Sequence, residues 1–64
     1  MSADGATLSS IASSIEEVTG RIAEIAGRYS DTERDEIAAA LFEVERSLTT
    51  ATRRLERVVD ALGT

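Results

Sequence analysis

The chain has 64 residues, a net charge of −5, and neither cysteine nor histidine. This composition excludes disulfides and His/Cys metal sites, and so short a chain rarely holds its fold with a core of its own. Because an acidic chain is a poor general binder of polyanions, nucleic acid and anionic membranes are disfavoured as partners. We therefore expect the chain to complete its core by associating with a second copy or with a protein partner.

The N-terminal stretch MSADGATLSS lacks the basic and apolar segments of a secretory signal peptide. No apolar run in the sequence is long enough to span a membrane. We expect a cytoplasmic protein. Export by a route that needs no signal peptide is the alternative.

The first predicted element is a helix over about residues 5–29. Its apolar residues alternate between steps of three and four, which is typical of a helix with a heptad repeat. Glu17 with Arg21 and Glu24 with Arg28 are ion pairs of helical spacing that support this prediction. The apolar series is Leu8, Ile11, Ile15, Val18, Ile22, Ile25 and Tyr29.

A turn is predicted at about residues 29–31, because the step from Tyr29 to Ile37 leaves the heptad register. Ser30 and Glu33 have the spacing of a capping box for a following helix. The surrounding acids suit the first turn of that helix, whereas a calcium loop would need Gly at Glu36 and Glu at Phe42. The acidic cluster comprises Asp31, Glu33, Asp35 and Glu36.

The second helix is predicted over about residues 32–62, with Gly63 suited to its C-terminal end. Its heptad series is Ile37, Leu41, Val44, Leu48, Ala51, Leu55, Val58 and Leu62. The short turn makes the two helices antiparallel neighbours, so residues 1–64 form one all-α hairpin. Folding about residue 30 brings Ile25 to Ile37 and Ile22 to Leu41, and leaves the end of the second helix uncovered.

In such a hairpin, the flanks of the apolar heptad residues stay partly exposed to solvent. A homodimer of hairpins that forms a four-helix bundle would cover them. The expected self-association core consists of Leu8, Ile11, Ile15, Val18, Ile22, Ile25, Ile37, Leu41, Val44, Leu48, Leu55, Val58 and Leu62. Phe42, Val59 and Leu62 are candidates for contacts beyond the hairpin.

Gly20 and Gly27 lie on one face of the first helix in a stripe of small residues. A partner helix could approach such a stripe closely. Alternatively, the stripe is solvent-facing and tolerates any residue, or the glycines keep the helix marginal until it binds.

The sequence contains no motif that is typical of an enzyme active site. The chain lacks the usual histidine base, a thiol nucleophile and a glycine-rich phosphate loop, and Glu16 and Glu17 point apart on a helix. We expect no enzyme activity, no cofactor, no metal and no small-molecule substrate. Arg53, Arg54 and Arg57 either contact a phosphate or an acidic partner, or pair with neighbouring acids.

The segment from Tyr29 to Glu33 fits the loose Y-x-x-x-[DE] pattern and resembles type VII secretion substrates, which are small acidic helical hairpins. This resemblance implies export. The segment lies in the turn rather than beyond the second helix, and the turn holds no W-x-G.

The sequence thus predicts a non-catalytic protein–protein interaction module, an adaptor, accessory subunit or regulator, that acts as an oligomeric hairpin. The alternatives are a secreted type VII-like substrate and a nucleic-acid-associated regulator that uses the three arginines.

Overall fold

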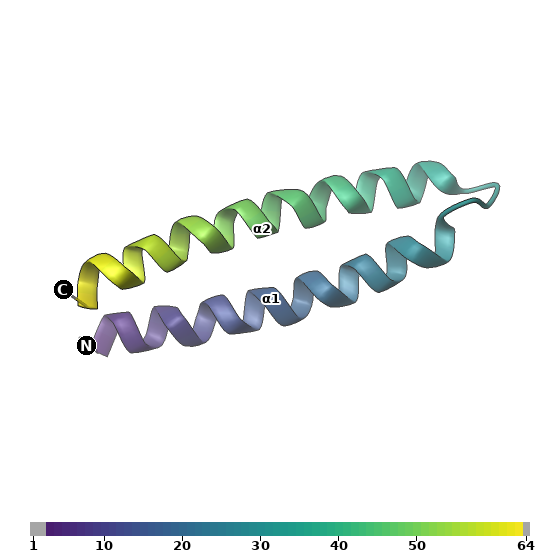
Figure 1. The fold of residues 1–64 in the computed structure, drawn as a ribbon. Coiled ribbons are helices and arrows are strands. Elements are labelled where there is room, and N and C mark those ends of the chain that lie inside the picture. The colour runs from purple at the N-terminus through teal and green to yellow at the C-terminus, as the bar shows by residue number, and fades with distance from the viewer. Residues whose placement is uncertain (1–2, 64) are drawn as a thin grey trace.

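The computed structural model describes residues 3–63, which form the two helices α1 (Ala3–Tyr29) and α2 (Asp35–Gly63) and the connection between them. Figure 1 shows the helices side by side and antiparallel, with the connection at one end and both chain ends at the other. The Cα atoms span 49 × 14 × 10 Å, so the molecule is a flat rod two helices wide. The prediction of an all-α two-helix hairpin is confirmed.

The connection between the helices is built on Asp31 and Thr32. The Ser30 amide completes α1 by donating to the Ala26 carbonyl at 3.2 Å, and Asp31 follows with a left-handed φ of 60°. Aspartate tolerates this conformation better than most residues, so Asp31 suits a helix end. The Thr32 hydroxyl then donates to the Tyr29 carbonyl and accepts from the Arg34 amide at 3.1 Å.

The predicted turn is therefore too short. Helix α2 begins at Asp35, and the described hydrogen bonds place Thr32, not Ser30, in the capping role before it. Ser30 is instead engaged at the end of α1. The first turn of α2 carries Asp35 and Glu36, as the helix macrodipole favours.

Small residues form the contact between the helices. In α1 the buried residues recur every seven positions as Gly5, Ala12, Thr19 and Ala26. Helix α2 matches them with Ala38, Glu45, Thr52 and Val59, of which Ala38 and Thr52 are buried and the others half-buried. Only the opposite helix can cover these positions within a two-helix chain. We call the two sets the central rows.

The two buried threonines satisfy their own hydroxyl groups. Thr19 Oγ1 donates to the Ile15 carbonyl at 2.6 Å, and Thr52 Oγ1 donates to the Leu48 carbonyl at 2.9 Å. Because each bond lies within its own helix, neither buried hydroxyl is left without a hydrogen-bond partner. Threonine also adds little bulk to the contact.

The expected layers of large side chains are displaced from this contact. The connection is centred on residue 32, so Ala26 lies level with Ala38, and Ala12 lies level with Thr52. No large side chain among the described residues is fully buried, and the buried hydrophobic core is Ala12, Ala26 and Ala38. Apart from Val59, which belongs to the central row of α2, the large aliphatic residues lie beside the contact, on one side of the rod.

Candidate functional site

The candidate site is an apolar face that runs the length of the hairpin. Its inner residues, next to the central rows, are the half-buried Leu8, Ile15, Ile22, Leu41, Leu48 and Leu55. Its outer residues are exposed: Ile11, Val18 and Ile25 on α1, and Val44, Ala51 and Val58 on α2. Val18 keeps 48% of its surface exposed and Val58 keeps 47%, values unusual for structural core residues.

Helical geometry gathers these residues on one side. The heptad repeat places the inner and outer positions on adjacent stripes of each helix, and the antiparallel arrangement turns both pairs of stripes to the same side. A shallow groove confirms that both helices contribute, because Ile15 of α1 lines it together with Ala51, Leu55 and Val58 of α2.

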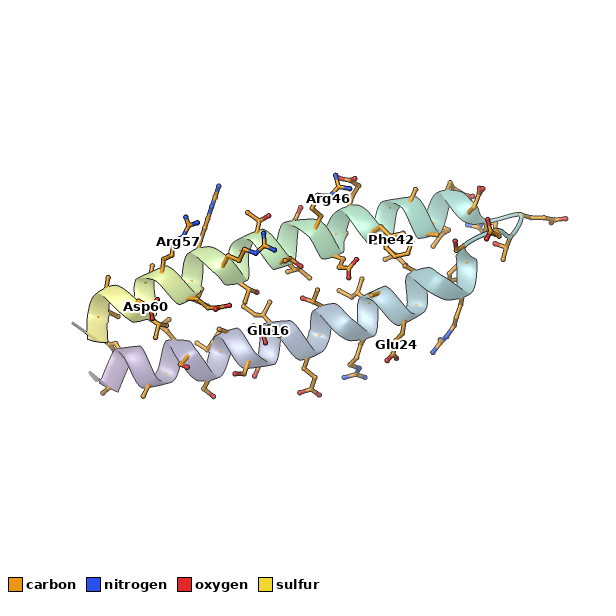
Figure 2. The ribbon with its side chains drawn as sticks, in the orientation of Figure 1. Glu16, Glu24, Phe42, Arg46, Arg57 and Asp60 are labelled. Carbon is orange, nitrogen blue, oxygen red and sulfur yellow. The ribbon has the colours of Figure 1, made fainter. Side chains whose placement is uncertain are left out.

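This groove has an apolar floor and a basic edge. Its volume is about 720 Å³, and Arg46, Ser47, Thr50 and Arg54 complete its lining on the outer side of α2. Figure 2 shows Arg46 and Arg57 projecting from α2 away from α1, so both guanidinium groups reach solvent. The groove can take apolar side chains and offers positive charge at its border.

The opposite side of the hairpin is polar. A smaller groove of about 370 Å³ is lined there by Glu16, Thr19, Gly20, Glu45, Thr49, Thr52, Arg53 and Glu56. The two broad sides of the rod therefore differ in chemistry, and only one of them offers a continuous apolar surface.

The glycine stripe lies outside the contact between the helices. A Cβ atom added at Gly20 or at Gly27 would meet nothing within 4 Å. Packing inside the hairpin therefore does not require glycine at either position.

The remaining predicted partner contacts fall in different places. Phe42 is 40% exposed and points from α2 toward α1 (Figure 2). Val59 is half-buried in the central row, where it borders a small groove with Ser9 and Ala12. Leu62 is exposed near the open end of the rod.

The structure separates the three arginines between the two sides. Arg53 lines the polar groove and Arg54 lines the apolar one, while Arg57 projects outward (Figure 2). They line no common pocket among those described.

The acidic cluster at the connection is a solvated helix start. Glu36 pairs with Arg34 at 2.8 Å, and both side chains are more than half exposed. Within residues 3–63, no group of three His, Cys, Asp or Glu side chains is arranged to hold a metal ion.

Sequence reasoning missed the central rows. The heptad spacing of Gly5, Ala12, Thr19 and Ala26 is as regular as that of the large aliphatic residues and is visible in the sequence. Small residues at such spacing allow two helices to approach closely, and this signal could have located the contact.

No family model, curated protein or solved structure matches this chain. Across residues 3–63, neither helix has the combination of length and apolarity that a membrane crossing requires.

Proposed function

We propose that the chain is a non-catalytic protein–protein interaction module that works as a dimer of hairpins. In this dimer the two apolar faces pack together with heptad-type packing and form a four-helix bundle. The observation that carries the proposal is the apolar face itself, which is continuous along both helices and exposed at its outer residues.

The hairpin has little core of its own. Within residues 3–63 the buried hydrophobic residues are three alanines, whereas exposed large residues include Ile11, Val18, Ile25, Val44 and Val58. Full burial of one such side chain contributes about 1.5–3 kcal/mol, and these side chains keep 40–48% of their surface exposed, so covering the face would add roughly half of that amount for each of them. A hairpin two helices wide cannot cover this face itself, and a second copy would cover it.

The size of the face suits a second copy. The Cα extents of 49 × 14 Å give the broad side a footprint of roughly 700 Å², close to the ~800 Å² that each partner contributes to a standard interface. A two-fold axis would match each apolar face with an identical one, which is the commonest symmetry of soluble oligomers.

The test compares two double variants by sedimentation. We expect the unmodified protein to sediment at twice its chain mass of 6.8 kDa at micromolar concentration. Val18→Gln with Val44→Gln places polar groups on the outer residues of the apolar face and should return the protein to a monomeric mass, because burying four unpaired amides, two from each copy, costs several kcal/mol per dimer.

The matched control carries the same new side chains elsewhere. Ser13→Gln with Ala39→Gln alters exposed positions outside the apolar face, one on each helix, and should leave the dimer intact. Ser13 shares its heptad position with Gly20 and Gly27, so a dimer that survives the first variant and is lost in the second would place the interface on the small-residue stripe instead. A folded, monomeric unmodified protein, shown by circular dichroism and sedimentation, would contradict the proposal.

A further inference from the structure

The charges of the hairpin are distributed unequally along its length. The hairpin is centred on residue 32, so its half nearer the connection is residues 16–48, which carry nine acidic side chains and four arginines. Residues 3–15 and 49–63, at the open end, carry three acidic side chains and three arginines. Nearly all of these side chains are exposed, with Glu45 half-buried. One end of the rod is therefore strongly negative, with a formal charge of −5, and the other end has no net charge.

Two arrangements would bury the apolar face in a symmetric dimer. Both connections could lie at the same end, or the connection of each copy could lie over the open end of the other. Both arrangements cover the same aliphatic residues, so apolar burial alone does not separate them.

We infer that the second copy docks with its connection over the open end of the first, giving an antiparallel dimer of hairpins. This inference rests on the proposed self-association and specifies its orientation. With both connections at one end, two halves of charge −5 would lie within the spacing of packed helices, about 10 Å, where physiological salt screens them only partly. In the opposite orientation, each negative half lies beside a half that has no net charge.

Local chemistry points the same way. The second half of α2 carries Arg53, Arg54 and Arg57, and Arg54 borders the apolar groove. The first half of α2 carries the exposed acids Glu36 and Glu43, which pair within the chain with Arg34 at 2.8 Å and with Arg46 at 3.2 Å. If the two α2 helices lie antiparallel across the interface, the acidic half of each comes beside the arginine-rich half of the other, which is the charge complementarity seen at specific interfaces.

A distance measurement distinguishes the two arrangements. The chain contains no cysteine, so Glu33→Cys provides a single site for a spin label in the connection. In the antiparallel dimer, pulsed dipolar spectroscopy should give a distance close to the 49 Å length of the rod. A distance below half that length would overturn the inference. The control is Glu17→Cys, near the middle of α1, which should give a distance well below 49 Å in either arrangement.

Salt provides an independent test. An antiparallel dimer should change its dissociation constant by less than about threefold between roughly 0.05 M and 0.5 M NaCl, because like-charged ends are far apart. Marked tightening with salt would indicate adjacent negative ends and contradict the inference. Sedimentation of the same samples separates the two claims. A monomer refutes the proposed function together with the orientation, whereas a dimer with a short distance refutes the orientation alone.

Discussion

Among individual residues, the glycines of α1 show how position decides what a glycine contributes. Gly5 is buried in the central row, where a small residue lets α2 approach. Gly20 and Gly27 are exposed, have ordinary helical backbone angles and face open space. Within a single hairpin, the only effect of glycine at these two positions is to lower the stability of the helix.

Gly20→Ala and Gly27→Ala should each stabilise the hairpin by about 0.5–1 kcal/mol, because alanine reduces the freedom of the unfolded chain and no neighbour obstructs its methyl group. Thermal denaturation followed by circular dichroism would measure this gain, with the dimer mass checked in parallel. Loss of stability or of the dimer in both variants would instead show that the glycines are needed for a close contact with another chain.

At the scale of the helices, the sequence was sufficient for the hairpin but not for its contact surface. Heptad spacing and the break after Tyr29 predicted two antiparallel helices, because apolar periodicity is a property of each helix alone. The contact depends on how the helices are rotated against each other. Both the stripe of large aliphatic residues and the central rows repeat every seven residues. A chain of two helices cannot enclose the stripe of large residues, because it is the wider of the two.

Prediction of the candidate site was limited in the same way. Heptad spacing identifies Val18 and Val44 as members of the apolar series, but it does not show that both stay exposed in the hairpin. The length of the connection was also missed. The positive φ of Asp31 moves the start of α2 to Asp35, and a serine three residues before a glutamate does not reveal that conformation.

Ala26→Leu should destabilise the hairpin by about 1–3 kcal/mol, because Ala26 is fully buried and a larger side chain would force the helices apart. Ala39→Leu is the control, since Ala39 is an exposed position of α2 where the same change should be nearly neutral. Chemical denaturation would provide both values. Equal effects of the two changes would contradict the placement of the central rows.

For the molecule as a whole, folding and association are expected to be coupled. Among residues 3–63 the buried hydrophobic residues are three alanines, and the proposed second copy would cover the long apolar face that the hairpin leaves exposed. Its stability is then a property of the dimer and depends on protein concentration.

Tenfold dilution should lower the melting temperature by about 5 °C, because it removes about 1.4 kcal/mol per dimer from a transition of this size. Melting curves recorded over a hundredfold range of concentration would show the trend. The variant Val18→Gln with Val44→Gln should have a lower melting temperature that no longer varies with concentration. A melting temperature of the unmodified protein that is constant over the same range would mean that the hairpin folds without its partner.

The common location of the two chain ends has a mechanical consequence (Figure 1). Tension applied to both ends peels α1 from α2 step by step instead of shearing the whole contact at once. Each step breaks one layer of small side chains, so a single hairpin should open at low force. In the antiparallel dimer, the connection of the second copy would lie across this opening end. Dimerisation would therefore raise the force that is needed to separate α1 from α2.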